Sequence, residues 1–137
     1  MSYTYMCEVV PVFVRPQSMT DEQACFGIIV RCPEAKFLSY RLAADDEPVI
    51  TRISNFFPDF GRANLERVMT WAANDIEFAF AAERKNGGEE AFANLIRPRE
   101  NVIRYGAPQV VMTDDLVRET NDLYARAVQR KIRNNSI

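Results

Sequence analysis

Two of the three cysteines, Cys25 and Cys32, could form a disulfide or bind a metal ion, because they stand close together in the stretch ACFGIIVRC. This stretch is rich in apolar and β-branched residues, which predicts a strand over residues 24–32. The two thiols would then face opposite sides and lie roughly 23 Å apart, whereas a disulfide needs Cα atoms within about 7 Å. We therefore predict that they neither pair nor share a metal, and that folding needs neither. Gly27 inside the strand predicts a bulge or a close backbone neighbour.

Histidine is absent from the whole sequence. Its absence excludes Ser-His and Cys-His nucleophile pairs, histidine-bound zinc and imidazole acid–base catalysis. A carboxylate enzyme, such as a metal-dependent nuclease, would have to use the adjacent acids Asp45, Asp46, Asp114 and Asp115. Acids before a helix are more often caps, and the first pair lacks the alternating acids and the glycine of an EF-hand loop. We expect no catalytic residue and no cofactor.

Arginines supply most of the positive charge, and three of them cluster in the stretch RPRENVIRY. Arginine favours two-pronged contacts with carboxylates and phosphates. In a regular strand Arg99 and Arg104 would face opposite sides, so Arg97, Arg99 and Arg104 act together only if the backbone turns at Pro98. We predict that these three arginines bind a partner or an anion. The alternative is that they pair with local acids such as Glu100 or face water.

Length and net charge limit the classes of protein to which this chain can belong. The 137 residues suit one domain, and the net charge of −2, from 17 basic and 19 acidic residues, argues against a dedicated nucleic-acid binder. That balance leaves room for a local basic patch. No apolar run approaches the ~20 residues of a membrane span, and the first residues lack the basic region of a signal peptide. We expect a soluble, cytoplasmic protein with reduced thiols and no membrane contact.

The elements that must position these residues form a single α+β domain over residues 3–133, followed by a frayed tail over 134–137. We predict a mostly antiparallel sheet of four or five strands, with two long helices and one short helix packed mainly on one face. Pro11 predicts that part of the first strand is an edge or a bulge. The form of residues 43–58 stays open. The predicted strands are 3–14, 24–32, 36–42 and two short strands within 101–112; the predicted helices are 59–85, 89–96 and 114–133.

The predicted helix over 59–85 has the strongest periodicity. Its apolar residues recur at spacings of three and four: Leu65, Val68, Met69, Ala72, Ile76, Ala79 and Phe80. Trp71 and Phe78 widen this face, which predicts that the helix packs on more than one side. A buried Trp71 would make Trp71→Ala destabilising by ~3–5 kcal/mol. The rival interpretation is that Trp71 is an exposed anchor for a partner.

Several short motifs recur in a familiar order along the chain: Val10-Pro11, Cys32-Pro33-Glu34, Phe37-Leu38, Pro98-Arg99, Ile103 and Asp114-Asp115. This order resembles the bacterial family called domain of unknown function 3037. The segment Ala24–Gly27 departs from the pattern where family members usually carry an asparagine. The resemblance implies no established activity. It implies a partner or accessory role, since members are often encoded beside a kinase-fold protein of the HipA type.

Three functions follow as hypotheses. The first is a non-enzymatic module that binds another protein, for which the resemblance suggests a HipA-type kinase-fold partner. The second is anion or nucleic-acid binding through Arg97, Arg99 and Arg104. The third is the carboxylate enzyme described above.

Overall fold

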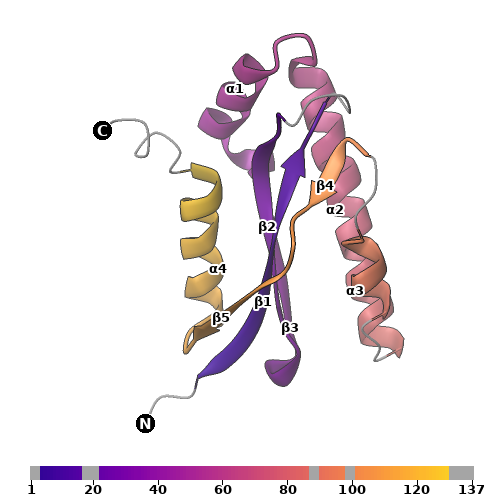
Figure 1. Cartoon of the computed structure of the whole chain (residues 1–137), viewed down its shortest axis with the longest axis vertical. Helices are drawn as coiled ribbons and strands as arrows, with labels where there is room; N and C mark the ends of the chain where they lie inside the picture. Colours follow the sequence, from indigo (N-terminus) through magenta and orange to yellow (C-terminus); the bar gives the residue numbers. More distant parts are fainter. Residues whose placement is uncertain (1–3, 17–21, 87–89, 98–100, 130–137) are drawn as a thin grey trace.

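The chain folds into an α+β structure, which confirms the predicted class (Figure 1). The computed structural model describes residues 4–16, 22–86, 90–97 and 101–129. The expected tail over 134–137 lies outside these residues. In chain order the elements are β1 (Tyr5–Val14), β2 (Ala24–Cys32), β3 (Phe37–Leu42), α1 (Glu47–Phe56), α2 (Gly61–Asn86), α3 (Glu90–Leu95), β4 (Ile103–Tyr105), β5 (Gln109–Thr113) and α4 (Leu116–Tyr124), which continues into a π-helical turn (Ala125–Gln129).

The five strands form one antiparallel sheet in the order β3-β2-β1, and β4 and β5 share the remaining edge of β1. Of the predicted edge or bulge at Pro11, the edge is wrong, because β1 is paired along both sides, but the pairing is interrupted there, between the pairs Val9–Gln109 and Val12–Tyr105. The Pro11 carbonyl accepts a hydrogen bond from Gly106 N at 2.9 Å. The N and C=O of a strand residue point to the same side. Proline has no backbone N–H, and at Pro11 this group would point to the junction between β4 and β5. No hydrogen bond of the sheet is therefore lost.

The β2–β3 hairpin forms as predicted, with Pro33 in its turn. A Cβ atom at Gly27 would lie 2.3 Å from Leu42 Cδ2 and 2.9 Å from the Arg41 carbonyl oxygen, which confirms the expected close neighbour. The register shifts between Val12 and Phe13 of β1, where β2 contains one extra residue, Phe26, so the expected bulge lies in β2 directly before the same glycine. Cys25 and Cys32 stand near opposite ends of β2, so their predicted separation is confirmed, but the extra residue Phe26 places both thiols on the same face of the sheet, which corrects the prediction that they face opposite sides.

Helices cover both faces of the sheet, which corrects the expectation that they lie mainly on one (Figure 1). The neighbours Tyr40 and Arg41 of β3 point to opposite faces. The Tyr40 hydroxyl donates to Glu77 of α2 at 2.6 Å, whereas Arg41 stacks on the Tyr124 ring of α4 at 4.1 Å. The physical reason is that both faces of β2 are apolar, so a strand with such a continuous apolar run must be covered twice.

The segment that the sequence left open contains α1, which buries Val49, Ile50 and Ile53. Asp46 caps this helix by accepting a hydrogen bond from Val49 N. The same carboxylate also accepts from Tyr124 at 3.0 Å and from Gln129 at 2.8 Å, and thereby ties α1 to α4 and to the π-helical turn after it. Asp46 therefore has a structural role as the cap of α1.

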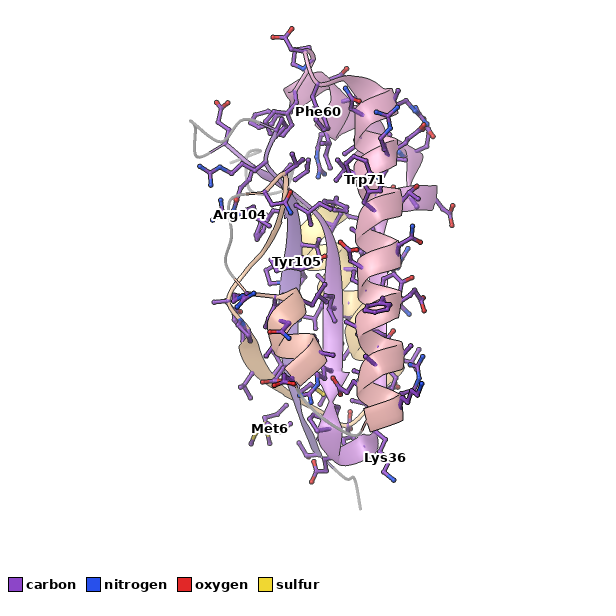
Figure 2. All side chains as sticks on the ribbon, turned by 90° about the vertical axis from the view of Figure 1, so that its right-hand side faces the viewer. Met6, Lys36, Phe60, Trp71, Arg104 and Tyr105 are labelled. Atoms are coloured by element: carbon purple, nitrogen blue, oxygen red, sulfur yellow. The ribbon has the colours of Figure 1, made fainter. Side chains whose placement is uncertain are left out.

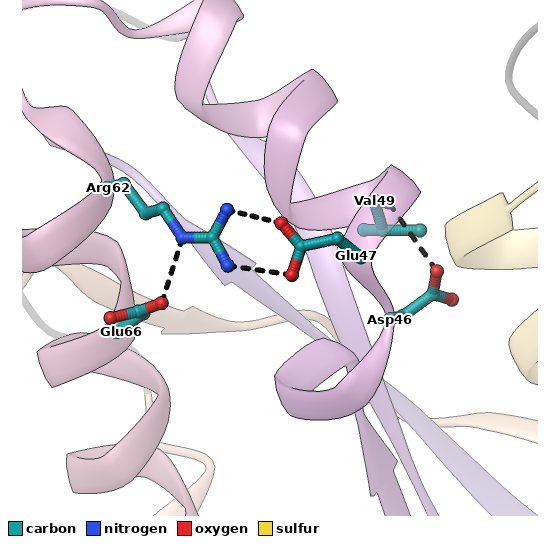
Figure 3. A network of polar contacts seen from close by, with 5 residues as sticks. All are labelled: Asp46, Glu47, Val49, Arg62 and Glu66. Carbon is teal, nitrogen blue, oxygen red and sulfur yellow. Dashed lines mark hydrogen bonds and ion pairs between the residues drawn. The ribbon is translucent and has the colours of Figure 1, made fainter.

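Arg62 of α2 joins α1 to α2 on the surface (Figure 3). Its guanidinium forms an ion pair with Glu47 of α1 and a second one with Glu66 of its own helix. All three side chains are well exposed, so water screens this network and its contribution to the free energy of unfolding is small.

Asp46→Asn should lower stability at neutral pH but not in acid. Partial burial raises the pKa of Asp46, but hydrogen bonds from Gln129, Tyr124 and Val49 outweigh it and hold the pKa below its usual value. Such a carboxyl stabilises the fold above its unfolded pKa of about 4, and the contribution is lost as the pH falls through the folded pKa. Asparagine still caps the helix. Melting curves of both proteins from neutral pH into acid should show a gap that narrows as the pH falls below about 4; a constant gap would contradict this assignment.

Candidate functional site: an arginine-lined cleft beside two exposed aromatic side chains

A cleft of about 520 Å³ lies on the face of the sheet that α2 and α3 cover. Three elements form it, because α3 packs along the end of α2 and the chain then returns as β4 beside β1. Figure 2 looks onto this side of the molecule, with α2 and α3 toward the viewer. The cleft is lined by Asp75, Phe78 and Ala79 of α2, Ala91, Asn94 and Leu95 of α3, Ile103, Arg104 and Tyr105 of β4, and Arg97 and Asn101.

Two of the three predicted arginines meet in this cleft. Arg97 lies two residues after the end of α3 and is exposed, whereas Arg104 lies in the middle of β4, opposite Phe13 of β1, and is half-buried. The predicted turn residue Pro98 and the third arginine, Arg99, lie outside the described residues. Both described arginines therefore line one cleft although seven positions separate them in the sequence, but the register sets the Arg104 side chain on the opposite face of β4 from Ile103 and Tyr105.

The acid Asp75 lines the same cleft. It comes from α2, so its place beside Arg97 and Arg104 could not be read from the local sequence. A cleft lined by two arginines and one aspartate suits a ligand of mixed charge better than a polyanion, since a carboxylate repels phosphates at close range.

Two large aromatic side chains extend the cleft along α2. Trp71 is 51% exposed and Phe78 is 78% exposed, so the expectation that Trp71 is buried is wrong. Residues 71, 75 and 78 share one face of the helix, because they are four and seven positions apart. Phe78 lines the cleft itself, and Trp71 lies about two turns nearer the start of α2.

A signal for these exposed aromatics was present in the sequence. At the helical period of 3.6 residues, Trp71 and Phe78 lie roughly 120–140° from the centre of the apolar stripe that contains Leu65 and Ile76. Leu65 and Ile76 are buried as the stripe predicts. The aromatic pair therefore did not widen the buried face, and its position on the helix predicted a second apolar surface.

The remaining candidates for chemistry have structural roles. Burial and a hydrogen bond with Cys32 raise the pKa of Cys7 to about 12, and burial raises the pKa of Cys25, so both thiols stay protonated near neutral pH and are poor nucleophiles. The contact between Cys7 and Cys32 across β1 and β2 was missed by the sequence analysis, which considered Cys25 and Cys32. Finding it required the strand register.

The acids at the start of α4 are also accounted for. Asp115 caps the helix by accepting a hydrogen bond from Arg118 N at 3.0 Å, and Asp114 lies 3.8 Å from the Arg118 guanidinium. Across the part of the chain that the structure describes, no three His, Cys, Asp or Glu side chains are grouped closely enough to hold a metal ion. None of the helices found there is long and apolar enough to cross a bilayer.

The fold and the cleft together define an α+β structure whose antiparallel sheet is covered on both faces and carries an arginine-lined groove. The chain belongs to the family described as "Protein of unknown function (DUF3037)", whose model matches residues 10–128. This match confirms the resemblance inferred from the ordered motifs. No curated protein and no solved structure matches the chain.

Proposed function

We propose that this protein is a non-enzymatic binding module whose cleft between α2, α3 and β4 receives an acidic and apolar segment of another protein. The observation that carries the proposal is the presence of Arg97 and Arg104 in the same cleft as the exposed Phe78, with Trp71 farther along the helix. Aromatic and arginine side chains are enriched at the centres of protein interfaces.

The chemistry of the partner follows from the lining. Arg97 and Arg104 favour carboxylates, which they can bind through paired hydrogen bonds. Phe78 and Trp71 favour apolar side chains on either side of those carboxylates. The family resemblance supplies one candidate, a kinase-fold protein of the HipA type. We also propose the cytoplasm as the compartment, since the three free thiols suit a reducing environment.

Anion or nucleic-acid binding through the same arginines is the second candidate. Arg97 and Arg104 on one surface favour it, whereas Asp75 in the cleft and the net charge of −2 count against it. Salt separates the two, because nucleic-acid binding falls steeply and linearly in log affinity against log salt.

The test is capture from an extract of the native host, followed by identification of the bound proteins and affinity measurement with the purified partner. Arg97→Ala combined with Arg104→Ala should remove the partner, with a loss of at least ~30-fold in affinity if the contacts are desolvated. The matched control is Arg118→Ala with Arg126→Ala, which removes the same charge from exposed positions of α4 and of the π-helical turn after it. Equal binding by both double variants would show that the cleft is not the partner site.

A further inference from the structure

The strand β5 exposes one edge of the sheet. It pairs with β1 along Tyr5–Val9, and no other described strand pairs with it. Its second edge therefore presents backbone N–H and C=O groups that no described strand satisfies. Such an edge is a template for another strand, and folded proteins usually blunt it with charges, prolines or bulges. The sequence of β5, QVVMT, contains none of these.

An apolar patch lies along this edge. Val110 and Met112 are 61% and 59% exposed, and Met6 of β1 is 57% exposed. The register sets Met6 opposite Met112 and Glu8 opposite Val110, so all four side chains lie on the same face of the sheet. Met6, Val110 and Met112 form one continuous surface, which we call the β5 patch. Contiguous exposed apolar patches mark interaction sites.

The β5 strand is suited to pairing with itself. A two-fold axis perpendicular to the sheet at Val111 would set Val110 of each copy opposite Met112 of the other, and Gln109 opposite Thr113. Charged residues on a self-paired strand would repel their copies. The strand has none, and Asp114, the first acid after it, would lie opposite the uncharged Pro108. The two β5 patches would also merge into one apolar layer across the axis.

We propose that the protein forms a two-fold homodimer in which β5 pairs antiparallel with β5 of a second copy, centred on Val111, so that one sheet runs through both copies. This surface is separate from the arginine-lined cleft, and the dimer does not depend on the proposed function. One short strand buries less area than a standard interface, so we expect a dimer that dissociates on dilution through the micromolar range.

Sedimentation equilibrium of the full chain over a wide concentration range tests the dimer, and paired charge variants test its register. Val110→Glu with Met112→Glu places like charges opposite each other across the axis, and should weaken association by at least ~100-fold. Val110→Lys with Met112→Glu places opposite charges at the same contacts and should keep the dimer. Both variants change the same two exposed positions, so circular dichroism and melting should show the native fold in each.

Three outcomes would overturn the proposal. The first is a wild-type chain that stays monomeric at the highest concentration reached. The second is a dimer that the Val110→Glu, Met112→Glu variant retains, since another surface would then hold it. The third is loss of the dimer in both charge variants, which would exclude pairing centred on Val111. If β5 amides of a monomeric chain become protected from hydrogen exchange when the captured partner is added, the edge belongs to that partner instead.

Discussion

Arg31→Ala should lower the free energy of unfolding by about 3–5 kcal/mol, the usual cost of removing one partner from a buried ion pair. The Arg31 side chain is 4% exposed and lies between two acids. Its guanidinium donates to Glu83 of α2 at 3.0 Å and to Glu8 of β1 at 2.8 Å, and it also stacks over the Phe92 ring of α3 at 5.1 Å. Alanine would leave the Glu83 carboxylate, which is only 14% exposed, without this charge partner.

Chemical denaturation measures this loss, and Arg62→Ala is the matched control. Arg62 also bridges two glutamates, but all three side chains are exposed to water (Figure 3). Removal of Arg62 should therefore leave the denaturation midpoint almost unchanged. Arg31→Met with Glu83→Leu should recover much of the lost stability, because an apolar pair of similar volume can replace a buried ion pair. If the two arginine variants unfold at the same midpoint, burial of the Arg31 network has no energetic consequence and the prediction is wrong.

Trp71→Ala should leave the fold intact and weaken partner binding. Because about half of the Trp71 surface is already in water, the free energy of unfolding should fall by about 1 kcal/mol or less, well below the loss expected for a buried indole. Trp71 and Phe78 share a helix face with Asp75 at the cleft, and an aromatic anchor of this kind contributes about 2 kcal/mol or more to binding. That loss corresponds to roughly 30-fold in the dissociation constant.

Thermal melting and titration with the purified partner separate the two effects. Ile76→Ala is the stability control, since Ile76 lies in the same helix but is fully buried and should cost about 2–5 kcal/mol. Phe56→Ala is the binding control, because Phe56 is similarly exposed but lies at the end of α1, away from the cleft lining. A Trp71→Ala variant that binds the partner as tightly as Phe56→Ala would remove Trp71 from the interface.

The local sequence predicted most of the secondary structure. Alternating and continuous apolar runs identified every strand, including the break at Gly106 that separates β4 from β5. The helical period identified α2 and α4, and the acid before α4 is its cap. The helix α1 was missed because its apolar residues fill less than three turns, which is too short for a clear period. The role of its cap, Asp46, follows from hydrogen bonds with Tyr124 and Gln129 that only the tertiary structure shows.

The spacing of apolar residues shows that a helix or strand has an apolar face, but it does not show which other helix or strand covers that face. That pairing depends on contacts between residues far apart in the chain, and only the tertiary structure decided it. Packing of α4 against the face opposite α2 buried both sides of β2. Packing of α2 against the other face joined Arg31 to Glu83, 52 residues later.

The same distinction between local sequence and tertiary structure applies to the candidate site. The sequence by itself determined that arginines are concentrated near Pro98, that no histidine is available and that the chain belongs in its family. The tertiary structure decided that Arg97 and Arg104 share a cleft with Asp75 and Phe78. The physical reason is that local residue patterns set backbone conformation and the side that each side chain faces, whereas a cleft exists only where separate elements pack together and leave space between their side chains.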